Sequence, residues 1–90
     1  MERIGILFHP LNKAACPLAG ELQGHLAARG MSVWTCSAWD ADRARDQLDG
    51  TELIITVGGD GTILRAAQAA VHHQIPITGV NLGKLGFMTE

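Results

Sequence analysis

Short apolar runs alternate along this chain with longer segments in which apolar residues recur every three or four positions. Runs at residues 4–8, 31–36 and 53–57 predict buried strands. The run at 53–57 (LIITV) is rich in β-branched residues and apolar on both faces, which is typical of a central strand in a parallel sheet. A fourth strand is predicted over residues 75–80, around Pro76.

Three helices are predicted between these strands. The first begins near Ala14 and ends at Gly30. Its apolar stripe has four-residue spacing and consists of Leu18, Leu22 and Leu26. Asp40 is expected to cap a second, short helix that runs through Leu48. The third helix spans residues 62–73, and its inward-facing residues are expected to be Ile63, Ala66, Ala67, Ala70 and Val71.

Strands that alternate with helices predict βαβ units and therefore a parallel sheet. Right-handed crossovers place helices on both faces, so the expected fold is a three-layer, Rossmann-like α/β domain. Ligands in such sheets bind beyond the carboxyl ends of the strands. The glycine-rich segments at residues 58–61 and 79–86 each follow a predicted strand, and both are expected at that edge.

Composition narrows the class of protein. The 90 residues are 47% hydrophobic and 18% charged, which suits one folded domain rather than a disordered tail. The formal net charge is −2, whereas nucleic-acid-binding domains usually carry an excess of basic residues, so this class is not favoured. The apolar run after the charged start is too short for a signal peptide or a membrane span, so we expect a cytoplasmic protein without a membrane partner. Cys16 and Cys36 are expected to be buried free thiols.

Residues 58–62 (GGDGT) carry the clearest chemistry, because three glycines surround one carboxylate between a strand and a helix. Glycines allow positive φ angles and close approach of a ligand, and free N–H groups at the helix start favour phosphate. Asp60 could accept a proton from a hydroxyl group or help to hold a phosphate-bound Mg²⁺. A simple helix cap is the alternative. The segment is neither a P-loop nor a dinucleotide fingerprint, because their spacings are absent.

The GGDGT segment resembles the motif shared by NAD kinases, diacylglycerol and sphingosine kinases and, more loosely, phosphofructokinases. Residues 63–67 (ILRAA) resemble its NAD kinase form, and residues 79–87 (GVNLGKLGF) resemble that family's second motif. Lipid kinases instead carry a Pro-Leu-Gly-Thr-type segment here, which this chain lacks. The resemblance covers residues 53–90 and implies a phosphofructokinase-like α/β fold, with residues 1–90 forming the N-terminal nucleotide-binding domain of an NAD kinase.

What the resemblance implies is transfer of the ATP γ-phosphate, with Mg²⁺ or another divalent cation, to the adenosine-ribose 2′-hydroxyl of NAD. Asp60 would be the general base, and Gly61 would contact the dinucleotide through its backbone. Arg65 would meet a phosphate or the ribose, or else be a solvated arginine. Leu64 and Phe87 would line the adenine pocket, or else pack in the core. The implied nucleotide-binding residues are Gly58, Gly59, Asp60, Gly61, Thr62, Leu64, Arg65 and Phe87.

Several polar residues outside this set each have a functional and a structural interpretation. Lys84 stands where the family often has arginine or histidine, and it is either a phosphate contact or a solvated lysine. Asn81 is expected to fix its loop by bonding to backbone. His9 and Asn12 follow the first strand and so lie at the ligand edge. The adjacent histidines 72–73 point about 100° apart on a helix, which excludes a shared metal site.

The family's Asn-Glu pair, its β-rich C-terminal domain and its assembly into homo-oligomers are not represented in these residues. We therefore expect a partial gene product or excised domain that holds half a site and is inactive alone. Two alternatives remain open at this point: a fragment of a lipid or sphingoid-base kinase, and a non-catalytic nucleotide-binding module.

Overall fold

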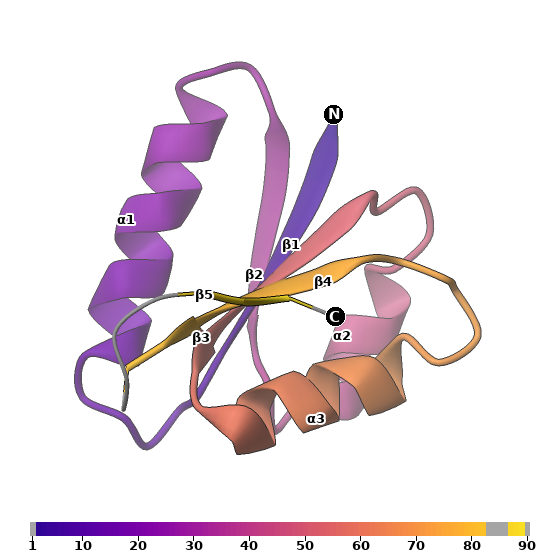
Figure 1. The fold of residues 1–90 in the computed structure, drawn as a ribbon. Helices are drawn as coiled ribbons and strands as arrows, with labels where there is room; N and C mark the ends of the chain where they lie inside the picture. The colour runs from indigo at the N-terminus through magenta and orange to yellow at the C-terminus, as the bar shows by residue number, and fades with distance from the viewer. Residues whose placement is uncertain (1, 83–86, 90) are drawn as a thin grey trace.

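The computed structural model of the protein describes residues 2–82 and 87–89 (Figure 1). Within them, one sheet has the strand order β2-β1-β3-β4-β5. Its strands are β1 (Arg3–Phe8), β2 (Ser32–Ser37), β3 (Leu53–Gly58), β4 (Ile77–Asn81) and β5 (Phe87–Thr89). The first four strands pair in parallel, as predicted. The short strand β5 pairs antiparallel with β4, in a segment that was expected to be a loop.

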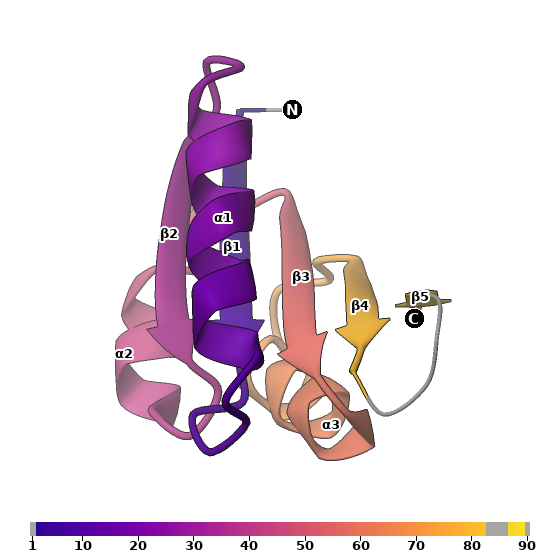
Figure 2. The ribbon, with the colours of Figure 1, turned by 90° about the vertical axis from the view of Figure 1, so that its left-hand side faces the viewer.

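Helices cover both faces of the sheet, which confirms the three-layer α/β prediction. Helix α1 (Ala15–Ala27) lies on one face, and α2 (Ala41–Asp46) and α3 (Asp60–Ala69) lie on the other (Figure 2). Side chains of the central strands point alternately toward the helix layer on one face of the sheet and the helix layer on the other. Ile6 and Val57 pack with α1, while Leu7 and Ile54 pack in the cluster on the α2 and α3 side. No helix in the described residues is long and apolar enough to cross a bilayer.

The first two helices follow the sequence pattern closely. Asp40 caps α2 by accepting a hydrogen bond from the backbone N–H of Arg43 at 3.2 Å, as predicted, although the helix ends at Asp46. The leucine stripe of α1 is only half-buried. The fully buried residues are Ala15 and Ala19, whose small side chains let the helix approach the sheet.

The third helix differs from the prediction at both ends. It begins at Asp60 because Gly59 is extended, with φ −136° and ψ −163°. The carbonyl of Gly59 accepts hydrogen bonds from the backbone N–H groups of Thr62 and Ile63. It ends at Ala69, and the chain then turns through Gln74, whose φ is +49°. The expected burial of Val71 is therefore wrong: it follows the helix and is 66% exposed.

Strand β4 begins at Ile77 and ends at Asn81, whereas the sequence predicts a strand over residues 75–80. Gly79 lies within both ranges. A Cβ atom on Gly79 would lie 2.6 Å from Thr56 Oγ1 on β3 and 3.0 Å from Ile63 Cδ1 on α3. This glycine therefore lets β3, β4 and α3 pack closely.

Candidate functional site

The two glycine-rich motifs meet at the carboxyl edge of the sheet. Gly58 is the last residue of β3 and pairs with Asn81, the last residue of β4. The backbone N–H of Leu82 donates a hydrogen bond to the carbonyl of Gly58 at 2.7 Å. The GGDGT turn and the start of the second motif are thus neighbours, as the order of the strands requires.

The glycines of the turn matter because they lack a side chain, not because they adopt an unusual backbone conformation. A Cβ on Gly58 would lie 2.4 Å from Thr62 Oγ1 and 2.9 Å from His9 Cβ, so no side chain fits there. At Gly59 and Gly61 a Cβ would meet nothing within 4 Å. The turn does not use the positive φ that glycine permits, because the positive-φ glycines of the described residues are Gly30 and Gly50. Gly59 and Gly61 therefore leave the surface of the turn open.

Asp60 stands at the rim of this open surface. It is the first residue of α3 and is exposed to solvent. Its Oδ1 accepts a hydrogen bond from Asn81 Nδ2 at 3.4 Å, and Asn81 itself is buried. The contact joins the two motifs through their side chains. The sequence predicts a backbone bond for Asn81, and that stays a prediction; the contact with Asp60 exists because β4 lies beside β3.

Thr62 supports the turn from beneath. It is fully buried, and its Oγ1 accepts a long hydrogen bond, 3.5 Å, from the N–H of Gly59. In a helix start, this bond satisfies one N–H group that would otherwise lack a partner. The threonine side chain thereby stabilises the start of α3, and its predicted contact with nucleotide stays a prediction.

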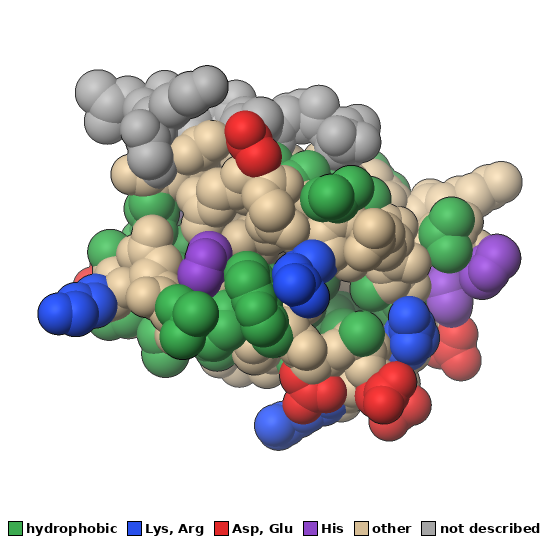
Figure 3. Space-filling view, turned by 90° about the horizontal axis from the view of Figure 1, so that it is seen from below, with side chains coloured by type: hydrophobic (Ala, Val, Ile, Leu, Met, Phe, Trp, Pro, Cys, Tyr) green, Lys and Arg blue, Asp and Glu red, His purple; other side chains and the backbone are tan. Residues whose placement is uncertain are grey.

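A cluster of two aromatic rings and one cation lies at the same edge and consists of His9, Trp39 and Arg65. The imidazole of His9 and the ring of Trp39 have centroids 4.5 Å apart and are tilted by 41°. The guanidinium carbon of Arg65 lies 4.1 Å from the centroid of the Trp39 ring. Figure 3 looks onto this edge and shows a hydrophobic side chain between a histidine and a cationic side chain. Sequence reasoning missed Trp39, whose only signal was a large aromatic residue directly after a strand.

The remaining predicted residues are placed as follows. Leu64 is 60% exposed on α3 and is therefore available to a ligand. The backbone of Phe87 pairs with Val80 in the β4–β5 ladder, but its side chain lies outside the described part, as does all of Lys84. Asn12 accepts a hydrogen bond from the N–H of Ala14 at 2.9 Å and so holds the turn before α1.

Potential metal ligands do not cluster at this edge in the part of the chain that the structure describes. Among the described residues, no group of three or more His, Cys, Asp and Glu side chains could hold an ion. Of the two histidines beyond α3, His73 lies at the surface with its Nε2 3.5 Å from Asp49 Oδ1. The edge therefore has no resident metal cage in its described part.

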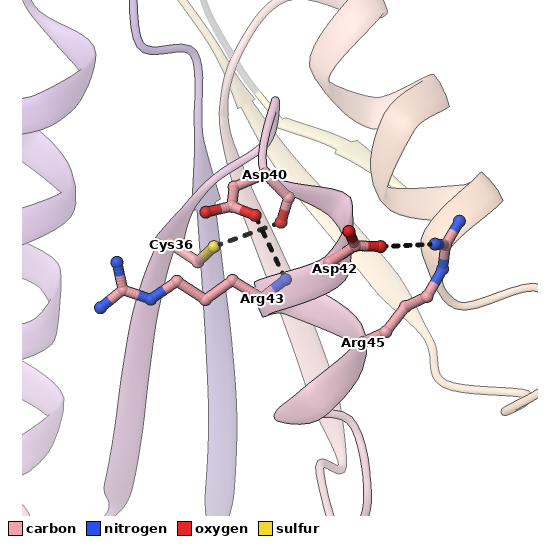
Figure 4. A network of polar contacts seen from close by, with 5 residues as sticks. All are labelled: Cys36, Asp40, Asp42, Arg43 and Arg45. Carbon is pink, nitrogen blue, oxygen red and sulfur yellow. Dashed lines mark hydrogen bonds and ion pairs between the residues drawn. The ribbon is translucent and has the colours of Figure 1, made fainter.

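The turn between β2 and α2 borders the edge, and Cys36 near the end of β2 places a buried thiol against it (Figure 4). Cys36 Sγ donates to the carbonyl oxygens of Ser37 and Asp40, at 3.3 and 3.7 Å. Burial raises the pKa of the Cys36 thiol, the Asp40 carboxylate raises it further, and Arg43 opposes both. The thiol is therefore a protonated donor that supports the β2–α2 turn, and it matches the expectation of a buried free cysteine. The same expectation is wrong for Cys16, which is exposed.

Comparison with known proteins adds a family. The profile described as the ATP-NAD kinase N-terminal domain matches residues 26–90. An NAD kinase of Dehalococcoides mccartyi is 54% identical over 89 residues, which are 99% of this chain and 31% of that protein. An NAD kinase of Chloroflexus aggregans is 38% identical over 90 residues, covering all of this chain and 33% of that protein. The chain spans about a third of the length of these curated relatives.

Proposed function

The chain belongs to the NAD kinase family, and from this premise we propose that it supplies half of a site for phosphorylating NAD. The reaction transfers the γ-phosphate of ATP to the 2′-hydroxyl of the adenosine ribose, giving NADP and ADP. The observation that carries the proposal is the exposed carboxylate of Asp60 between two glycines with open space above them. A lone base beside an uncovered backbone suits a reaction that depends on positioning.

Asp60 acts in this proposal as the general base. Its carboxylate accepts the proton of the 2′-hydroxyl, whose oxygen forms a bond to the γ-phosphorus. The bond between that phosphorus and the β,γ-bridging oxygen breaks, and ADP leaves with the electron pair. The hydrogen bond from Asn81 orients the carboxylate from the side of β4.

Binding is assigned to the open surface of the turn and to α3. The backbone at Gly59 and Gly61 is accessible because neither residue carries a side chain and nothing covers them within 4 Å of an added Cβ. Leu64, exposed one turn along α3, is assigned to the adenine pocket together with Phe87. Gly58 and Thr62 take the role of supporting this surface from below.

A divalent cation fits the described residues only as an ion carried by ATP. One carboxylate cannot form a cage, but Mg²⁺ in phosphoryl-transfer sites is bound mainly by phosphate oxygens and water. Asp60 is the residue that would contact it, and the bound ion would neutralise phosphate charge.

The test is a chimeric enzyme in which this chain replaces the 89 aligned residues of the Dehalococcoides mccartyi NAD kinase. We expect the chimera to phosphorylate NAD with ATP and Mg²⁺, and the Asp60→Asn variant to lose at least about a hundredfold in kcat with little change in KM. The chain alone is expected to show no turnover. Near-normal kcat in Asp60→Asn would remove the general base, and a chimera that is folded yet inactive would contradict the proposal.

A further inference from the structure

Trp39 occupies an unusual place for a tryptophan. The other indole of the protein, Trp34, is buried, and its Nε1 donates a hydrogen bond to Thr51 Oγ1 at 2.9 Å. Trp39 is 40% exposed and lies at the ligand edge instead of in the core. Packing of the sheet therefore does not account for this large aromatic residue.

The backbone directs Trp39 toward the end of β1. The N–H of Ala38 bonds to the carbonyl of Phe8 at 2.8 Å, which extends the β1–β2 ladder by one residue. Ser37 Oγ accepts from the N–H of Trp39 at 3.1 Å, and the carbonyl of Ser37 accepts from the N–H of Asp40 at 3.1 Å. This turn fixes the main chain on both sides of the indole.

His9 is also fixed where it meets the indole. Its N–H bonds to the carbonyl of Val57 at 2.9 Å, and its Nδ1 accepts from the N–H of Leu11 at 3.0 Å. The imidazole therefore has a defined orientation where it contacts the Trp39 ring. The loops after β1 and β2 together form a rigid support for the third member of the group, Arg65 on α3.

Arg65 carries a positive charge that no described carboxylate neutralises. The ion pairs among residues 2–82 involve Arg45 with Asp42 and His73 with Asp49. The guanidinium of Arg65 instead lies on the Trp39 ring. A cation–π contact at an exposed position adds little stability. It does restrict the arginine side chain before binding, so that less conformational entropy is lost when the side chain binds an anion.

The position of Arg65 on α3 relates it to the open turn. It follows Gly61 by four residues, so the two lie on one face of the helix. Helical side chains lean toward the N-terminus, which brings Arg65 over the turn that contains Gly61. Helix geometry therefore puts the open space at Gly61 and the cation restrained on Trp39 on the same side of α3.

We propose that Trp39 is a positioning residue whose indole, backed by His9, holds the Arg65 guanidinium at the carboxyl edge for a phosphate group of the bound nucleotide. The inference rests on the proposed function for the identity of the nucleotide. Guanidinium groups bind phosphate in a defined geometry, which a restrained side chain can present at lower entropic cost than a free one.

The experiment uses the chain itself and inorganic tripolyphosphate as the probe, titrated while amide and arginine N–H resonances are followed by NMR. We expect Arg65→Gln to raise Kd at least about fivefold, and the matched control Arg45→Gln, which removes another exposed arginine, to change it less than about twofold. Trp39→Leu should raise Kd at least about threefold without changing the thermal midpoint, while the aromatic variant Trp39→Phe retains binding.

The double variant Trp39→Leu/Arg65→Gln distinguishes positioning from a separate contribution by Trp39. It should bind no more weakly than Arg65→Gln alone, because the indole acts through the guanidinium. Additive losses, or no detectable binding up to about 10 mM tripolyphosphate, would overturn the proposal. The probe contains neither ribose nor nicotinamide, so this outcome is independent of whether the chimeric enzyme phosphorylates NAD.

Discussion

Asn81 Nδ2 lies 3.4 Å from Asp60 Oδ1, and this contact connects the end of β4 to the first residue of α3 across 21 positions of sequence. The pairing of Gly58 with Asn81 sets the distance, because it brings the last residues of β3 and β4 side by side. The orientation of the candidate base is therefore determined by the sheet register as well as by its own turn.

Replacing Asn81 tests this relationship. In the chimeric enzyme, Asn81→Ala is expected to lower kcat by about tenfold, because Asp60 loses the donor that orients it. Asn81 is buried and has contacts besides Asp60, so the variant is also expected to be less stable. Kinetics must therefore be measured well below the thermal midpoint of the variant. Equal kcat for a folded Asn81→Ala enzyme would show that Asp60 needs no partner on β4.

The glycines of the turn should separate into two kinds. Gly58→Ala is expected to lower the free energy of unfolding by about 1–3 kcal/mol, because its methyl group would overlap Thr62 Oγ1 and His9 Cβ. Urea denaturation followed by circular dichroism measures this loss.

Gly61→Ala is the matched control, because the same methyl group meets open space within α3. Its stability should be unchanged or slightly increased, since alanine favours helix over glycine. Gly61→Val should weaken nucleotide binding in the chimeric enzyme without a backbone clash. Equal destabilisation by Gly58→Ala and Gly61→Ala would mean that the space at Gly58 is not limiting.

A buried hydrogen-bonded chain stabilises the opposite part of the domain. Trp34 Nε1 donates to Thr51 Oγ1 at 2.9 Å, and that hydroxyl donates to the carbonyl of Gln47 at 2.7 Å. Thr51→Val preserves the shape but leaves Trp34 Nε1 without its acceptor, while the Gln47 carbonyl keeps its bond from Arg3 Nη2, so the change should cost about 1–3 kcal/mol. Thr51→Ser keeps the hydroxyl and should recover most of the loss in the same denaturation experiment.

The raised pKa of Cys36 predicts how stability varies with pH. Below the ordinary thiol value of 9.0 the thiol is protonated in both states, so its contribution is constant. Above that value the unfolded chain ionises first, and the free energy of unfolding should fall as pH rises. Denaturation at about pH 8 and about pH 10 measures the difference.

Cys36→Ala supplies the control, because it should remove the fall in the free energy of unfolding that Cys36 causes at alkaline pH. Cys16→Ser should retain that fall. The exposed Cys16 should also react with a thiol reagent much faster than the buried Cys36. Equal labelling rates in the native protein would contradict the burial of Cys36.

The amino-acid pattern was sufficient for the parallel sheet and for the position of the GGDGT turn. A β-branched strand such as β3, followed by glycines and a helix, reflects local preferences and a fixed rule about where parallel strands end. Asp60 was therefore placed at the carboxyl edge from sequence alone. The helix boundaries were less accurate, because the start of α3 depends on the extended conformation of Gly59.

Tertiary structure alone decided which side chains meet at that edge. Asn81 reaches Asp60, and Trp39 contacts both His9 and Arg65, only because the strand order β2-β1-β3-β4 brings these loops together. Such partners are 21 or more residues apart in sequence. Hydrophobic periodicity reports which face of an element is buried, but it carries no information about the distance between side chains of different elements. That distance is set by strand register and close packing.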